Sequence, residues 1–270
     1  MPSILTTDCI CRAVDMRCGL DCYNLICVNS MQLKSLYILL FALLSLSAQS
    51  QQQEDAVRDE LSRRAVQCDS VGVDSCAKYA EDWVAALPQE ELLFYARQAE
   101  KVLYRPYPSY CSRVMYRTLL GRLLQDASDD VALLRYKYQY EMLCRNNEGD
   151  CATDFVYYDV DGMEHSLSDS RGARTLLIFN NPECEECALL REHIIATGEL
   201  AGCLVDSTTT VLLVYPDEPT DAWREAVMHY PSTWIIGYSE DVSDLYDLRT
   251  LPSTYWLDEE QRIMKRDAHQ

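Results

Sequence analysis

The chain has 270 residues, which is enough for one large domain or two small ones. Hydrophobic residues make up 48% of it, so a sizeable core is expected. A net charge of −19 argues against binding to nucleic acids or anionic membranes, because both present negative charge to a partner. We therefore expect an acidic, well-hydrated surface and no nucleic-acid partner.

The beginning of the chain contains the pattern of an export signal. Residues 31–34 supply a start-like methionine and a lysine, and the apolar run 36–46 suits the hydrophobic part of a signal but is short for a membrane span. Residues 48–50 have the small-x-small spacing of a cleavage site. We predict that residues 31–50 are a cleaved signal peptide, which places the mature chain in the periplasm without a membrane anchor. A buried core helix is the alternative.

Residues 1–30 precede this complete signal and have no clear periodicity. We interpret them as the product of a mis-assigned start codon, with translation beginning at Met31. A metal-binding leader is the alternative, and peptides from this segment in native protein would contradict our interpretation. The segment contains five cysteines, namely Cys9, Cys11, Cys18, Cys22 and Cys27.

Eight cysteines follow the predicted signal, and in an oxidising compartment such residues can persist as disulfides. Cys68 with Cys76, and Cys144 with Cys151, are close enough in sequence to bridge helix ends, but sequence alone does not fix a pairing. Small buried hydrophobic side chains are the other interpretation. The remaining four cysteines are Cys111, Cys184, Cys187 and Cys203.

Residues 51–150 are predicted to form an all-α domain of about five helices. Asp74 or Ser75 is a candidate cap of the second helix, and Pro88 suits the first turn of the third. The tyrosines of this domain are expected to be mainly core residues, with a ligand groove as the alternative. The predicted helices are Asp55–Val66, Asp74–Ala86, Gln89–Leu103, Tyr110–Leu124 and Val131–Cys144.

The pattern changes after Asp150, where short apolar strands begin to alternate with helices. Val160-Asp-Gly162 is a hairpin signal between the first two strands. Helices are predicted from Cys184 to about Ala196 and after a cap at Thr220 or Asp221. Residues 151–270 are therefore predicted to form a separate α/β domain. Its main predicted strands are 154–159, 165–167, 175–179, 209–215, 254–257 and 262–265.

One stretch of this domain has the order strand, turn, Cys-x-x-Cys, helix. Asn180-Asn-Pro182 interrupts the strand 175–179, and Cys184-Glu-Glu-Cys187 opens a periodic segment. A helix N-terminus offers unpaired N–H groups and the positive end of a dipole, and both favour a thiolate. The order predicts a thioredoxin-type dithiol. A zinc site is the alternative, but it needs two further ligands, and only His193 and Cys203 are candidates.

Residues 151–267 resemble periplasmic thioredoxin-like proteins related to the thiol-disulfide oxidoreductases TlpA and ResA. The resemblance rests on Leu176-Leu-Ile-Phe-Asn-Asn-Pro182, on Val214-Tyr-Pro-Asp217 and on Tyr246-Asp-Leu-Arg-Thr-Leu-Pro-Ser253. Upstream, residues 103–109 and 145–155 are similar to a helical domain of unknown function that precedes such modules in many Bacteroidetes proteins. The resemblance implies an α/β thioredoxin fold preceded by a small all-α domain, thiol-disulfide exchange, and no cofactor or metal.

The resemblance also implies roles for particular residues. Cys184 attacks a substrate disulfide, and Cys187 resolves the mixed disulfide. Pro252 corresponds to the cis-proline of the facing loop, which leaves the backbone of Leu251 free to pair with an extended substrate chain. The implied partners are disulfide-containing exported proteins and an unidentified electron donor. The other expected substrate contacts are Pro182, Glu185 and Glu186.

Three features depart from the family pattern. Glu183 stands where the family usually has Trp, and the negative charge of Glu185 and Glu186 disfavours a thiolate at Cys184. A less stabilised thiolate suits a reducing protein better than a strong oxidant. No C-terminal helix is predicted after the last strand, so the helical domain or a partner is expected to cover part of one sheet face. The alternative function is a redox-inactive binding or scaffold protein with a structural Cys184–Cys187 disulfide.

Overall fold

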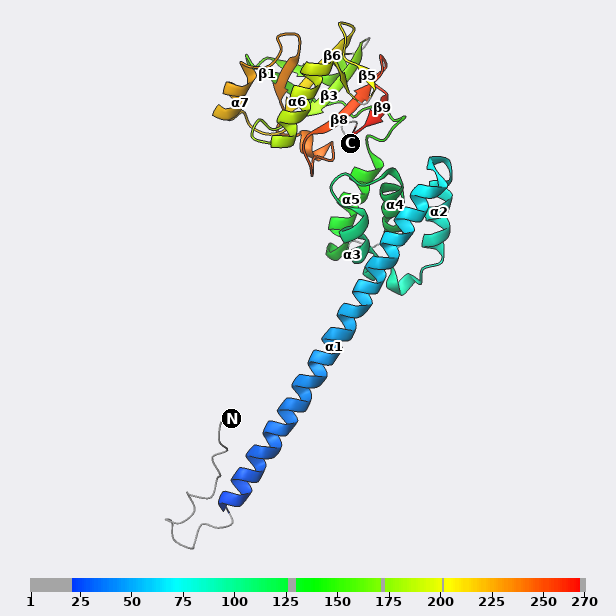
Figure 1. Ribbon diagram of the computed structural model, residues 1–270, viewed down its shortest axis with the longest axis vertical. Coiled ribbons are helices and arrows are strands. Elements are labelled where there is room, and N and C mark those ends of the chain that lie inside the picture. Colours follow the sequence, from blue (N-terminus) through cyan, green and yellow to red (C-terminus); the bar gives the residue numbers. More distant parts are fainter. Residues whose placement is uncertain (1–20, 126–129, 171–172, 201, 268–270) are drawn as a thin grey trace. The chain divides into compact units, whose positions relative to one another are not determined.

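The computed structural model describes residues 21–125, 130–170, 173–200 and 202–267. Its side chains are described from Ala42 onward, except at position 74. The chain separates into two units, Met1–Val57 and Arg58–Gln270. Helix α1, Asp21–Val71, supplies the described residues of the first unit and the beginning of the second (Figure 1).

The first predicted helix, Asp55–Val66, is too short at both ends. α1 includes the predicted signal segment and runs on to Val71, because no Gly or Pro interrupts the sequence between residues 21 and 71. Residues 42–53 are exposed, so this part of the chain is not a buried core helix. Among the described residues, no helix has the length and apolar character that a membrane crossing requires. The interpretation of residues 1–30 lies largely outside the described part of the chain.

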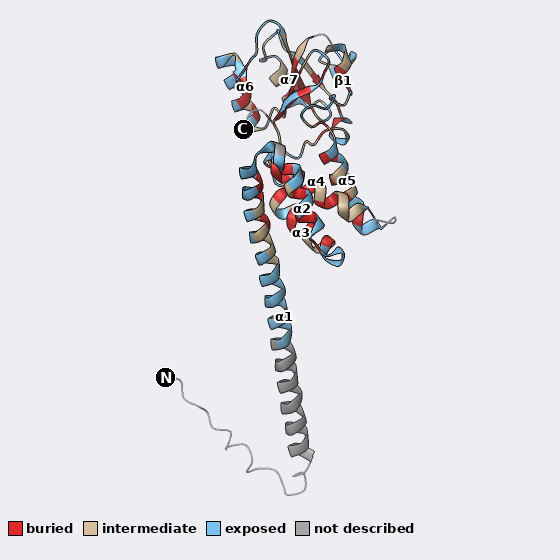
Figure 2. Cartoon of the chain, turned by 90° about the vertical axis from the view of Figure 1, so that its right-hand side faces the viewer, coloured by how far each residue is buried: buried red, intermediate tan, exposed pale blue. Residues whose placement is uncertain are grey.

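The other helices of the helical region lie close to their predicted positions. Short 3-10 turns at Gln89–Glu91 and Val131–Leu133 precede two of them. Ser109 caps the helix after the proline-containing segment, since its hydroxyl accepts a hydrogen bond from the Ser112 N–H at 3.1 Å. Figure 2 shows buried residues along the helices of this region. The helices are α2 (Val73–Ala85), α3 (Leu92–Leu103), α4 (Tyr110–Leu124) and α5 (Leu134–Cys144).

Two features of the helical region, the cap of α2 and the burial of the tyrosines, became clear only from the structure. Gly72, with φ of 83°, is the N-cap of α2 and makes no side-chain capping bond, so the predicted caps at Asp74 or Ser75 are wrong. Both residues lie inside the first turn because α2 begins at Val73. The expectation of core tyrosines is correct for Tyr116 and Tyr136, whereas others, such as Tyr138, are exposed.

The second half of unit 58–270 is built around a seven-stranded mixed sheet of order β2-β1-β7-β6-β3-β8-β9. The central strand β3 pairs in parallel with β6 and antiparallel with β8. A two-stranded hairpin of β4 (Glu199–Leu200) and β5 (Cys203–Leu204) was not predicted. The sheet strands are β1 (Val156–Asp159), β2 (Glu164–Ser166), β3 (Arg174–Phe179), β6 (Thr209–Tyr215), β7 (Ile235–Tyr238), β8 (Ser253–Leu257) and β9 (Ile263–Arg266).

Alternating side chains of β3 supply two separate cores, one on each face of the sheet. Leu177 and Phe179 pack with Tyr246 and Tyr255 on one face. On the other face, Leu176 and Ile178 pack with side chains of helix α6 (Glu185–Thr197), including Leu190 and Ile194. A short helix, α7 (Asp221–Val227), begins at the predicted cap Thr220. The predicted class, an α/β thioredoxin fold preceded by an all-α region, is confirmed.

Candidate active site

The turn between β3 and α6 places the first cysteine at the start of a helix. The Asn180 N–H donates to the Val214 carbonyl at 2.9 Å, which fixes the end of β3 against β6. The side-chain oxygen of Asn181 accepts a hydrogen bond from the Glu183 N–H at 2.9 Å. The backbone carbonyl of Asn181 accepts one from the Cys184 N–H at 3.2 Å. This local hydrogen bonding is typical of Asn in a turn. Cys184 is therefore the N-cap of α6.

The two cysteines of the Cys-x-x-Cys motif have different surroundings. Cys184 is partly exposed, and its sulfur accepts a hydrogen bond from the Cys187 N–H at 3.2 Å. This bond is the cap of α6, and a donor at this position stabilises negative charge on the sulfur. Cys187 lies one turn further along α6 and is completely buried. Burial, followed by its interaction with Cys184, raises the pKa of Cys187 to about 12, although nearby Arg191 acts in the opposite direction.

A loop from the other side of the sheet faces Cys184. The peptide bond between Leu251 and Pro252 is cis, the geometry that the sequence resemblance implies for Pro252. The Leu251 carbonyl oxygen lies 3.5 Å from the Cys184 sulfur and also accepts a hydrogen bond from the Tyr107 hydroxyl at 3.2 Å. The Leu251 carbonyl therefore already accepts one hydrogen bond, and the pairing of the Leu251 backbone with a substrate stays a prediction. The donor is a side chain of the helical region.

The contact of Tyr107 with Leu251 belongs to a wider contact between two segments. Arg249 donates to the Tyr104 carbonyl at 2.9 Å, and its guanidinium lies 3.3 Å from the centre of the Tyr104 ring. Arg249 also forms an ion pair with Asp247 at 2.7 Å. The segment between α3 and α4 thus holds the loop that faces the cysteines. Sequence analysis missed this contribution, because 144 positions separate Tyr107 from Leu251.

The acidic residues beside the motif do not contribute equally. One carboxylate oxygen of Glu186 lies 3.7 Å from the Cys184 sulfur. Glu185 and Glu183 are exposed, and Pro182 is half-buried. Only Glu186 therefore brings its charge to within contact distance of the sulfur in the described structure.

The zinc alternative requires two further ligands beside the Cys-x-x-Cys motif, for which His193 and Cys203 were the candidates. His193 is exposed, and Cys203 lies partly buried on β5. Among the described residues, a single group of three or more His, Cys, Asp or Glu side chains is close enough to share an ion, and it excludes both cysteines of the motif. It consists of Cys68, Cys76 and Cys111.

Comparisons with known proteins show relatives of the sheet domain and of the fold. No family model matches the chain. Two curated relatives, both named thiol-disulfide oxidoreductase ResA, are 27% identical to it. The relative from Geobacillus thermodenitrificans matches over 119 residues, 43% of this chain and 67% of the relative. The relative from Geobacillus kaustophilus matches over 117 residues, 43% of this chain and 66% of the relative.

A solved structure extends the similarity beyond the sheet. A thioredoxin-like protein from Bacteroides caccae is 25% identical, with a TM-score of 0.60 over 72% of this chain and 73% of its own. That share of 270 residues exceeds the segment 151–267, so the match includes part of the helical region. The chain is a thioredoxin-like protein related to TlpA and ResA.

The predicted disulfides are not present in this thioredoxin-like protein. All eight cysteines whose side chains the structure describes are free thiols, including the predicted pairs of Cys68 with Cys76 and of Cys144 with Cys151. Cys144 and Cys151 are both exposed. Cys68 and Cys76 are buried with their sulfurs 3.2 Å apart, so this pair is close in space but not bonded. Cys184 and Cys187 are in the dithiol form.

Proposed function

We propose that this chain is an exported thiol-disulfide oxidoreductase that reduces or exchanges disulfides of periplasmic proteins through Cys184 and Cys187. The observation that carries the proposal is the asymmetry of the two thiols. The Cys184 sulfur is accessible and is held by an N–H donor at the start of α6, whereas Cys187 is buried directly behind it. An attacking thiol has to reach the substrate, and a resolving thiol only has to reach its neighbour.

The proposed reaction proceeds in two exchange steps. The Cys184 thiolate attacks one sulfur of the substrate disulfide, forms a mixed disulfide and releases the other substrate sulfur as a thiolate. Cys187 then loses its proton, which the released thiolate can accept, and attacks the Cys184 sulfur. The second substrate sulfur leaves as a thiolate and takes a proton from solvent, which received the Cys184 proton when that thiol ionised, and the chain keeps a Cys184–Cys187 disulfide. The substrate gains two electrons and two protons, which a dithiol electron donor must restore to the chain.

The raised pKa of Cys187 has a consequence for the order of these steps. With a pKa of about 12, Cys187 remains a thiol at neutral pH while Cys184 carries out the first attack. A proton acceptor is needed only after the mixed disulfide has formed. This order prevents Cys187 from competing with Cys184 for the incoming substrate.

The same arrangement suggests where a substrate chain binds. Pro182, Glu185 and Glu186 are within two positions of Cys184 in the sequence, Glu186 lies 3.7 Å from its sulfur, and Leu251 faces it from the loop before β8. We propose these four residues as substrate contacts. Export rests on the signal pattern of residues 31–50, and the proposed partners are exported disulfide-containing proteins and an unidentified electron donor.

A mixed-disulfide trap tests the proposal. In the Cys187→Ser variant the second step is blocked, so covalent complexes with exported proteins should accumulate and should disappear on reduction. The matched control is Cys203→Ser, which removes another partly buried thiol and should trap nothing. The wild-type chain should also reduce insulin with a small dithiol as electron source. Absence of both trapped complexes and insulin reduction would overturn the proposal.

One observation favours the alternative of a redox-inactive binding protein. The Leu251 carbonyl, which a substrate backbone would need, already accepts the Tyr107 hydroxyl. If this contact never opens, the carbonyl oxygen has only one lone pair left for a substrate backbone, which weakens pairing with the loop. A scaffold of this kind would bind partners without any dependence on Cys184, so non-covalent partner binding that persists in a Cys184→Ser variant identifies it.

A further inference from the structure

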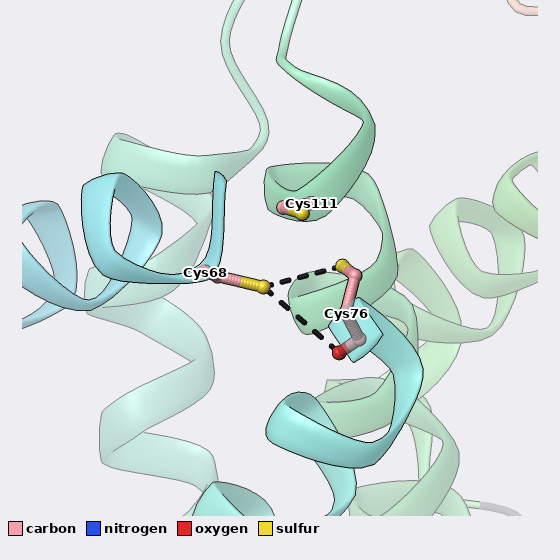
Figure 3. A group of neighbouring side chains, drawn as sticks. All are labelled: Cys68, Cys76 and Cys111. Carbon is pink, nitrogen blue, oxygen red and sulfur yellow. Dashed lines mark hydrogen bonds between the residues drawn. The ribbon is translucent and has the colours of Figure 1, made fainter. Parts of the chain in front are cut away.

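The side chains of three cysteines of the helical region lie close together. None of them belongs to the proposed exchange site, which consists of Cys184 and Cys187. Cys68 lies in the last turn of α1, Cys76 in the first turns of α2, and Cys111 is the second residue of α4. Their sulfur atoms all lie within 4.8 Å of one another. Figure 3 shows the three side chains on three separate helical segments, with the sulfurs of Cys68 and Cys76 facing each other at 3.2 Å. We refer to these residues as the cysteine cluster.

The cysteine cluster is enclosed by protein. Cys68 and Cys76 are completely buried, and Cys111 is 2% exposed. The Cys68 sulfur also lies 3.9 Å from the Cys76 carbonyl oxygen. A soft ligand bound between the sulfurs would therefore be shielded from water and from competing oxygen ligands.

Two simpler explanations account for only part of this geometry. A disulfide between Cys68 and Cys76 requires a sulfur separation of about 2.05 Å and leaves the third sulfur without a role. Cysteines as small hydrophobic residues need no sulfur-to-sulfur convergence, because any side chain of similar volume fills the space. The convergence of three sulfurs from three helices is what a shared ligand would require.

We propose that Cys68, Cys76 and Cys111 bind a soft, thiophilic metal ion, of which Cu(I) fits best and Zn(II) is the second candidate. Metal–sulfur bonds of about 2.3 Å place the sulfurs of one site about 3.8 to 4.0 Å apart. The sulfurs of Cys68 and Cys76 are 3.2 Å apart and the other pairs at most 4.8 Å, so shifts of less than about 1 Å would bring all three to this spacing. Cu(I) is satisfied by three thiolates, whereas structural zinc sites almost always have a fourth ligand.

Burial raises the pKa of the Cys68 and Cys111 thiols, so a bound ion has to displace their protons, and the helix N-termini offset only part of that cost. Cys76 and Cys111 both lie in the N-terminal turns of their helices, where backbone N–H groups and the helix dipole stabilise anions. Three thiolates around a monovalent ion are anionic, so this placement offsets part of the cost of burying the site. The bound ion would link α1, α2 and α4 and stabilise the helical region.

Metal titration of the reduced, full-length chain tests the proposal. The variant used as background has Cys184, Cys187 and the five cysteines before residue 30 each replaced by serine. Only the cysteine cluster and three other cysteines then remain. Under anaerobic conditions, Cu(I) and Zn(II) are added separately in competition with a chromophoric chelator, and native mass spectrometry counts the bound ions. We expect one ion per chain, a rise in Tm of roughly 5 °C or more, and binding at least about a hundredfold weaker after Cys111→Ser.

The matched control is the double variant Cys144→Ser/Cys151→Ser, which removes two exposed thiols and should leave binding unchanged. Binding of either ion that depends on all three cluster cysteines supports the proposal. Equal affinity of the background and its Cys111→Ser variant overturns it, as does a chain that takes up no ion after reduction and re-forms a Cys68–Cys76 disulfide in air. If Cys111→Ser does not fold, X-ray absorption of the loaded background decides, because absence of sulfur ligands at about 2.3 Å overturns the proposal.

Discussion

The exchange site and the cysteine cluster use the same functional group in opposite surroundings. At the exchange site, the Cys184 sulfur is partly exposed and accepts an N–H bond, and a carboxylate lies 3.7 Å away. In the cysteine cluster, all three sulfurs are buried and lie mainly against one another. Both groups include a residue at a helix N-terminus, so the dipole alone does not distinguish them. What distinguishes them is whether a disulfide from another molecule can reach the sulfur. Exchange requires room for an incoming disulfide, whereas metal binding benefits when other molecules are kept out.

The largest effect that follows from this comparison is a difference in alkylation rate. In the folded, reduced chain without metal, we expect Cys184 to react with iodoacetamide at least about a thousandfold faster than Cys76, since a buried thiol reacts only after local or global opening. Exposed Cys144 reports the rate of an accessible thiol that lacks a helix cap. Mass spectrometry of peptides after timed quenching measures each rate. If Cys76 reacts as fast as Cys144, the cluster is not closed and the comparison fails.

A smaller effect is expected from the ion pairs that anchor the loop in front of Cys184. Asp247 is largely buried between Arg249 and Arg266. Burial alone would raise the pKa of Asp247, but the Arg249 hydrogen bonds and the two positive charges outweigh it and lower the pKa below 3.8. The stability that this carboxylate contributes is therefore present above pH 3.8 and is lost as the pH falls through the lowered value.

The Asp247→Asn variant should accordingly lose about 2–4 kcal/mol of unfolding free energy at neutral pH, because Arg249 loses its ion-pair partner and Arg266 keeps only Asp267. The difference from wild type should shrink below pH 3.8. Urea unfolding at both pH values measures it. Asp221→Asn is the matched control, since Asp221 pairs with Arg224 in full exposure and should change stability by less than about 0.5 kcal/mol. A constant difference at both pH values would show that the carboxylate charge is not the cause.

The sequence predicted those parts of the fold that depend on local pattern. The bounds of α4 and β6 agree with the predicted segments, because amphipathic or apolar runs with clear ends determine them. The Cys-x-x-Cys motif was found for the same reason. The contact of Tyr107 with Leu251 and the approach of Cys111 to Cys68 depend on how helices and loops pack over long sequence separations. No local pattern encodes these contacts, so the structure was needed to find them.

The next prediction concerns the contact that closes the exchange site. Tyr107→Phe removes the hydroxyl that occupies the Leu251 carbonyl and frees this acceptor for a substrate backbone. One hydrogen bond has a net value of about 1 kcal/mol, so kcat/KM for peptide disulfides should rise by about three- to tenfold. A small disulfide without a peptide backbone should react at an unchanged rate. Tyr110→Phe, which alters an exposed tyrosine nearby in sequence, is the control. A decrease with peptides would show instead that Tyr107 assists the reaction.

The smallest predicted effect distinguishes the two acidic residues between the cysteines. Only Glu186 lies near the Cys184 sulfur, so Glu186→Gln should favour the thiolate more than Glu185→Gln does. Two charges about 4 Å apart in a water-like environment interact by about 1 kcal/mol, which corresponds to roughly a two- to fivefold faster alkylation of Cys184 at neutral pH. Because the pair is exposed to solvent, added salt should reduce the difference. Equal effects of both variants would mean that general surface charge, rather than the position of Glu186, restrains the thiol. The acidic motif would then tune Cys184 through its total charge, and removal of either carboxylate would have the same effect on the rate.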